Sequence, residues 1–82
     1  MKRSVISEDA KAGIRSIPRH IAMNVLTAIH RFAEHGLGDV KELQNRAGEK
    51  RLRAGDYRVR FTEEHPDTLR VHAVKKRKDA YR

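Results

Sequence analysis

Two short runs near the C-terminal end alternate apolar and basic residues, and this alternation constrains the fold more than any other feature. In the first run, Tyr57, Val59 and Phe61 alternate with Arg58 and Arg60. Successive side chains of a β-strand point to opposite faces, so a period of two is typical of a half-buried strand. The pattern therefore predicts a strand with one apolar face and one basic face.

The second run repeats the pattern. Leu69, Val71 and Ala73 alternate with Arg70 and His72. If the two runs pair, one face of the sheet is apolar and the other carries cations with few carboxylates nearby. A face of that kind suits a polyphosphate such as a nucleic acid.

Size and composition restrict the class of protein. The chain has 82 residues, which is enough for a single domain over residues 1–82. Its net charge of +8 favours an anionic partner, which can be nucleic acid, a membrane surface or an acidic protein. It contains no cysteine, so disulfides and thiolate metal sites are excluded. No apolar run approaches the ~20 residues of a membrane span, and the first residues lack the apolar stretch of a signal peptide. We expect a small, soluble, cytoplasmic protein.

The first half of the sequence predicts a short strand and a helical hairpin. Residues 3–6 are the strand, and Ser7 is a suitable N-cap for a helix over residues 8–15. A second helix can start at Pro18, and Gly36 is a suitable stop. Its apolar stripe has helical spacing and consists of Ile21, Val25, Ile29 and Phe32.

The second half predicts a sheet. Residues 37–50 are polar and contain two glycines, so we expect a loop there, with at most one helical turn. Strands are expected at about 49–54, 57–62 and 68–74, joined by short turns into an antiparallel meander. The predicted fold class is α+β, with the short strand and helical hairpin packed on one face of a small antiparallel β-sheet. The basic face is left open.

Three segments resemble a known family. They are residues 39–43 (DVKEL), 50–59 (KRLRAGDYRV) and 71–82 (VHAVKKRKDAYR). Together they resemble the RelE/ParE superfamily of toxins from type II toxin–antitoxin systems, over nearly the whole chain and best over residues 50–82. The chain departs from the family pattern in its shortened first strand and in Lys50, which replaces an aromatic residue.

The resemblance implies an activity and a set of partners. Toxins of the RelE branch cleave mRNA, usually in the decoding site of the ribosome, and need no metal or other cofactor. The 2′-hydroxyl of the RNA attacks the adjacent phosphate, which requires a base, cations that offset the charge on the phosphate, and an acid for the leaving oxygen. The implied partners are mRNA, the ribosome and a cognate antitoxin protein.

The resemblance also assigns candidate catalytic residues. Arg58 is the leading phosphate clamp, because its planar fork can hold two oxygens. Arg77 is a second clamp and Tyr81 carries the proton, since neighbouring cations favour the phenolate form of a phenol. Arg51 can flank the phosphate, but an arginine cannot act as a base at ordinary pH. The further RNA-binding candidates are Lys50, Arg53, Arg60, Arg70, His72, Lys75, Lys76 and Lys78.

Simpler interpretations remain open. The strand arginines can form a solvated face that only keeps the sheet soluble, and Tyr57 fits a core position better than a catalytic one. The histidines show no metal-ligand spacing, so no metal site is expected. Two other functions compete with the nuclease: a ParE-like toxin that inhibits DNA gyrase by protein–protein binding, and a nucleic-acid-binding module without catalysis.

Overall fold

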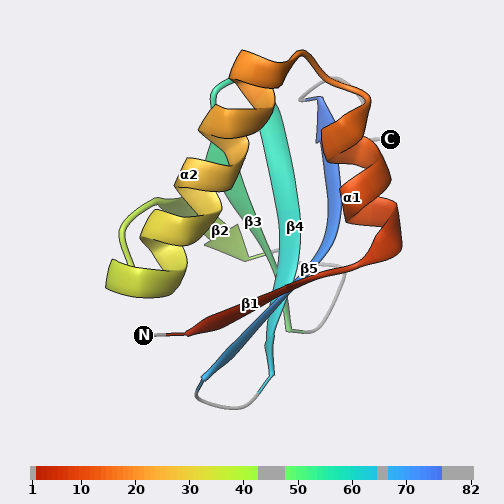
Figure 1. The fold of residues 1–82 in the computed structure, drawn as a ribbon. Coiled ribbons are helices and arrows are strands. Elements are labelled where there is room, and N and C mark those ends of the chain that lie inside the picture. The colour runs from red at the N-terminus through yellow and green to blue at the C-terminus, as the bar shows by residue number, and fades with distance from the viewer. Residues whose placement is uncertain (1, 43–47, 65–66, 77–82) are drawn as a thin grey trace.

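A computed structural model describes residues 2–42, 48–64 and 67–76, and in it two helices pack on one face of a five-stranded sheet (Figure 1). The elements in chain order are β1 (Arg3–Ile6), α1 (Glu8–Arg15), α2 (Arg19–His35), β2 (Asp39–Glu42), β3 (Glu49–Ala54), β4 (Tyr57–Glu64) and β5 (Thr68–Lys76). The predicted α+β class is confirmed, and so is the packing of both helices on one face of the sheet. The short strand was expected on that face with the helices, which was wrong, because β1 belongs to the sheet itself. Within the described ranges, neither helix combines the length and the hydropathy that a membrane span requires.

The sheet has the strand order β1-β5-β4-β3-β2. Strands β3, β4 and β5 form the expected antiparallel meander. The sheet as a whole is mixed, because β1 pairs with β5 in parallel. The expectation of a loop throughout residues 37–50 was wrong, since β2 lies there and pairs with β3. Only Val40 of this four-residue strand packs against the core, so the segment carries too little alternation to be recognised.

The helices begin and end where the sequence indicated. Ser7 caps α1, and its hydroxyl accepts a hydrogen bond of 3.1 Å from the backbone N–H of Ala10. The same hydroxyl donates to the carbonyl oxygen of His72 at 3.0 Å, which ties the start of α1 to β5. Gly36 ends α2 with a φ of 70°, a left-handed conformation that glycine adopts without steric cost.

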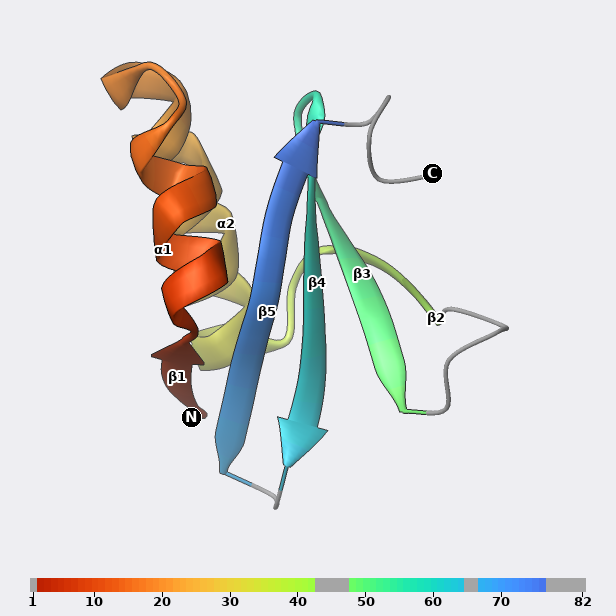
Figure 2. The same ribbon diagram turned by 90° about the vertical axis from the view of Figure 1, so that its right-hand side faces the viewer.

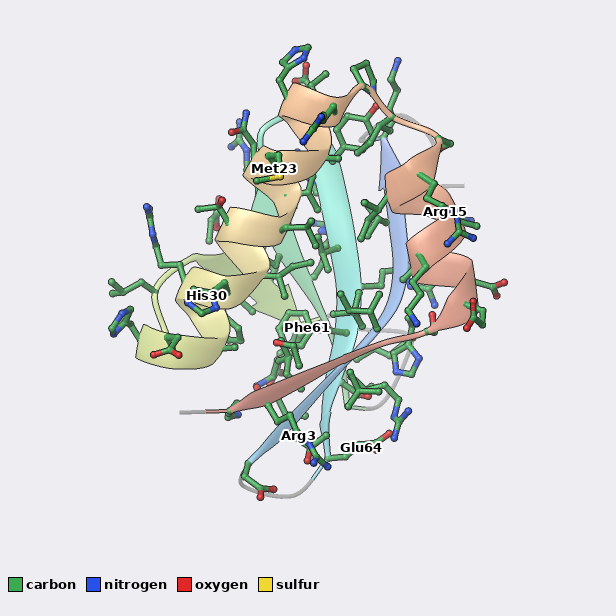
Figure 3. All side chains as sticks on the ribbon, in the orientation of Figure 1. Arg3, Arg15, Met23, His30, Phe61 and Glu64 are labelled. Atoms are coloured by element: carbon green, nitrogen blue, oxygen red, sulfur yellow. The ribbon has the colours of Figure 1, made fainter. Side chains whose placement is uncertain are left out.

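The core lies between α2 and the helix-facing side of the sheet. Phe61 of β4 is fully buried there (Figure 3), and its ring centroid lies 5.2 Å from that of Phe32. Val25 and Ile29 supply the buried face of α2. Tyr57 is buried in the same cluster, as its alternation with apolar residues predicted. The aromatic and aliphatic side chains of the first basic run thus fix which face of β4 turns away from the helices.

Strand β5 contains a β-bulge. Arg60 lies opposite Ala73, whereas the next residue of β4 lies opposite Val71, so His72 is an extra residue. The strict alternation expected along this strand was therefore wrong beyond Val71. The bulge shifts the phase by one position, so Val74 rather than Ala73 reaches the buried core.

Candidate functional site

The sheet face opposite the helices, here called the open face, is turned away from α1 and α2 (Figure 2). The strand register places a row of three cations on it. Arg58 points to this face, because its neighbours Tyr57 and Val59 are buried on the helix side. The strand register places Arg53 of β3 and Lys75 of β5 directly opposite Arg58. We call Arg53, Arg58 and Lys75 the cationic row. Like charges that face each other across strands are destabilising, so an anion lying over the row would relieve the repulsion.

The bulge decides which of two lysines joins this row. Without the extra residue at His72, alternation would turn Lys76 to the open face and Lys75 toward the helices. With it, Lys75 lies opposite Arg58 and Lys76 lies opposite the buried Tyr57. Of these two predicted RNA-binding residues, the structure brings only Lys75 to the cationic row.

Arg58 is held in place by the backbone. The residue is only 6% exposed, and its Nη1 donates hydrogen bonds of 3.0 Å to the carbonyl oxygens of Gly55 and Tyr57. A buried guanidinium needs such partners to offset the loss of water. Among the described residues, its Nε and Nη2 make no hydrogen bond. The N–H groups of these two nitrogens form the edge that can hold two oxygens of one phosphate.

Carboxylates share the open face, so the expectation of few carboxylates near the cations was wrong. The ion pairs and their N–O distances are Arg60–Glu49 (3.0 Å), Arg70–Glu64 (2.8 Å) and Arg53–Asp39 (4.0 Å). The sequence did contain a signal for the first pair. Glu49 precedes Arg51 by two positions in the same strand, so alternation alone places both on one face. The open face is therefore a mixed surface in which several arginines already have an anionic partner.

Lys50 lies apart from the other candidates. It is opposite the buried Phe61, which places it on the helix side of the sheet. Its Nζ donates to Glu63 Oε1 at 2.7 Å, and Lys2 pairs with the second oxygen of the same carboxylate. This cluster ties Lys2, the residue before β1, to β3 and β4, and the structure does not bring Lys50 to the open face.

The remaining candidates divide into two groups. Arg51 lies opposite Arg60 on the open face, one row away from the cationic row. His72 also faces this side, and its Nε2 lies 2.8 Å from Thr62 Oγ1. The other group lies outside the described residues and consists of Arg77, Lys78 and Tyr81.

A depression runs along the edge of β5, between α1 and the open face of the sheet. Its sheet side is lined by Glu49, Arg60, His72, Ala73, Val74 and Lys75, and its helix side by Ser7, Asp9 and Gly13. We call it the β5 hollow. It lies beyond Val71, the last residue of β5 that pairs with β1. Within the part of the chain that the structure describes, no cluster of histidine and carboxylate side chains has the composition of a metal site.

The fold is shared with toxins that have been crystallised with their antitoxins. A RelB–RelE antitoxin–toxin complex from Methanococcus jannaschii contains a chain that matches with a TM-score of 0.76 at 20% identity, covering 94% of both chains. The RelBE2 toxin–antitoxin complex from Mycobacterium tuberculosis gives a TM-score of 0.77 at 20% identity, covering 92% of this chain and 96% of that one. The DinJ–YafQ complex from E. coli gives 0.75 at 9% identity with both chains fully covered.

These likenesses establish the fold. No family model matches the sequence, and no curated protein sequence matches it significantly. The chain thus has the fold of RelE-type toxins.

Proposed function

We propose that this chain is the toxin of a type II toxin–antitoxin system and that it is a metal-independent endoribonuclease. It would act in the cytoplasm and cleave mRNA at the ribosomal A site, inhibiting translation. The observation that carries this proposal is the cationic row of Arg53, Arg58 and Lys75. It lies on the open face of a fold shared with RelE-type toxins.

Arg58 has the geometry that the chemistry requires. Attack of a 2′-hydroxyl on the adjacent phosphate adds negative charge to the phosphate oxygens in the transition state. Donors that are fixed beforehand stabilise such charge most effectively, because they need no reorganisation during the reaction. Two backbone carbonyls hold the Arg58 guanidinium in this way. Arg53 and Lys75 flank it and attract the phosphates of a single strand.

Proton transfer is assigned to Tyr81. The cationic row consists of two arginines and a lysine, and an arginine cannot serve as a base. Tyr81 follows Lys76 by five positions in the sequence, and its role rests on the family resemblance. In this mechanism Tyr81 removes the 2′-proton, and the 2′-oxygen bonds to phosphorus as the P–O5′ bond breaks. The leaving 5′-oxygen takes a proton from water, so the products are a cyclic phosphate and a 5′-hydroxyl, and Arg77 adds a second cation to the scissile phosphate.

The test is a primer-extension map of a defined mRNA incubated with the purified chain, with and without translating ribosomes. Arg58→Ala and Tyr81→Phe are assayed beside the wild type. Arg15→Ala on the outer side of α1 is the matched loss of one arginine away from the open face (Figure 3). We expect new 5′ ends within codons, present with the wild type and Arg15→Ala and lost in the other two variants. An intact message in every lane would contradict the nuclease proposal, and a gyrase supercoiling assay would then test the ParE-like alternative.

The proposal includes a cognate antitoxin. The toxins of similar fold were crystallised in complexes with antitoxins. We expect expression of this chain alone to arrest bacterial growth, and co-expression of its antitoxin to restore it. Unimpaired growth with a folded, abundant wild-type chain would count against a toxin of either kind.

A further inference from the structure

Arg60 has an incompletely satisfied guanidinium in the β5 hollow. Its Nη2 donates to Glu49 Oε1 at 3.0 Å, and the two side chains are only 22% and 15% exposed. The neighbouring Nε is buried and has no hydrogen-bond partner among the described residues. A buried N–H without an acceptor is costly, so this pairing leaves the arginine short of one partner.

A phosphate can accept hydrogen bonds from both nitrogens on the Nε/Nη2 edge of the Arg60 guanidinium, whereas Glu49 accepts from only one of them. The N–H groups of Nε and Nη2 are parallel, and together they hold two oxygens of one phosphate. In the structure, the carboxylate meets only the second of these two nitrogens. A phosphate could therefore replace Glu49 at Arg60. Its oxygens would accept hydrogen bonds from both Nε and Nη2.

The β5 hollow gives such a ligand a place beside the cationic row. Arg60, His72 and Lys75 line it, and Lys75 belongs to both features. Arg60 is two residues from Arg58 along β4, or about 7 Å in a strand, so one extended RNA strand can reach both. Asp9 and Glu49 also line the hollow and oppose the positive charges.

We propose that the β5 hollow is a second phosphate subsite for the RNA, and that Glu49 occupies Arg60 until a phosphate displaces it. This inference rests on the proposed function and adds a device that regulates the affinity of the same face. Glu49 keeps Arg60 oriented in the free protein and makes weak, non-specific anions poor competitors. A strand already bound at the cationic row delivers its next phosphate to Arg60 at high local concentration.

The experiment measures affinity without cleavage. A short single-stranded RNA with 2′-O-methyl riboses lacks the attacking hydroxyl, and its binding is followed by fluorescence anisotropy at several salt concentrations. Glu49→Gln is compared with Glu64→Gln, which removes the same charge from the same face but next to Arg70, outside the hollow. We expect Glu49→Gln to bind about fivefold more tightly, since no ion pair has to open, and Glu64→Gln to stay within about twofold of wild type.

Removing Arg60 provides the converse test. Arg60→Gln is expected to weaken binding and to lower the slope of log affinity against log salt by about 0.7, the value for one phosphate contact on a single strand. The double variant Glu49→Gln/Arg60→Gln should bind like Arg60→Gln alone. Urea unfolding of each variant gives the folded fraction with which its affinity is corrected.

The outcomes separate this inference from the proposed function. Equal gains in RNA affinity in Glu49→Gln and Glu64→Gln would show a general charge effect and would contradict the proposed subsite. An unchanged slope in folded Arg60→Gln would also overturn it, while leaving the nuclease at the cationic row intact. Wild-type protein that binds the RNA neither free nor in the ribosomal A site would instead contradict the proposed function.

Discussion

Arg58 shows how one side chain serves both the fold and the proposed chemistry. Its Nη1 donates to the carbonyl oxygens of Gly55 and Tyr57 at the β3–β4 turn. Its Nε and Nη2 make no hydrogen bond among the described residues, and the proposed function assigns them to a phosphate. A lysine at this position would keep the charge, but its single nitrogen cannot hold two carbonyls and two phosphate oxygens in a fixed plane.

We therefore expect Arg58→Lys to lower the cleavage rate by about 100-fold or more, the usual cost of losing one oriented donor to a transition state. Single-turnover cleavage of the defined mRNA measures this, with circular dichroism confirming that the variant is folded. Arg15→Lys, the same exchange on α1, serves as the control and should cleave at the wild-type rate. Comparable rates in all three proteins would remove Arg58 from the mechanism.

Alternation alone was sufficient to place Arg58 on the open face, because its two neighbours are apolar. Its burial was not predictable, since that depends on the side chain folding back over a turn whose carbonyls point inward. The partner of Arg60 could be predicted only in part. The sequence shows that Glu49 shares a strand face with Arg51, but only the structure shows that Glu49 pairs with Arg60 on the neighbouring strand.

Among the elements, β5 has the largest influence on the site. The sequence predicted the strand but not its bulge, because an extra residue leaves the alternation intact on each side and changes only its phase. Lys75 and Lys76 are chemically alike, so nothing in the sequence distinguished them. Strand β2 was missed for a different reason. Its four residues lack the alternation typical of a strand, and they are extended because they pair with β3.

The contact between α1 and β5 gives a prediction about stability. A Cβ built on Gly13 would lie 2.6 Å from the carbonyl oxygen of Val74, well inside van der Waals contact. We expect Gly13→Ala to lower the free energy of unfolding by about 1–3 kcal/mol, because this overpacking outweighs the better helix propensity of alanine. Urea unfolding measures the change.

Ala12→Gly is the matched control for this prediction, since Ala12 is exposed on the same helix. It measures the propensity difference by itself, about 1 kcal/mol in the destabilising direction. If Gly13→Ala were more stable than wild type by that same amount, α1 would not approach β5 as closely as described.

For the whole molecule, the net charge of +8 overstates the cations available on the open face. Arg60 and Arg70 lie 3.0 and 2.8 Å from carboxylates, whereas the exposed Arg53 of the cationic row is 4.0 Å from Asp39. Binding of RNA should therefore depend on a small set of residues rather than on overall charge, with the cationic row as its centre.

Binding through a few residues of the cationic row predicts a specific salt dependence of the RNA affinity. The double variant Arg53→Gln/Lys75→Gln should lower the slope of log affinity against log salt by about 1.4, or about 0.7 for each lost phosphate contact. The measurement uses the non-cleavable RNA over a range of salt concentrations. Arg15→Gln/Lys11→Gln removes the same charge from exposed positions on α1 and should leave the slope unchanged. Equal slopes in the two double variants would mean that the RNA responds only to net charge.

The position of β5 in the sheet has a consequence for biosynthesis. Among the described strands β5 is the last to be made, yet it lies between β1 and β4. The hydroxyl of Ser7 donates to the carbonyl oxygen of His72 across 65 positions of sequence. A chain that emerges N-terminus first cannot complete the sheet, the bulge or the cationic row until β5 has left the ribosome. Under the proposed function, the nascent chain therefore has no cationic row with which to hold RNA until β5 is free to pair between β1 and β4.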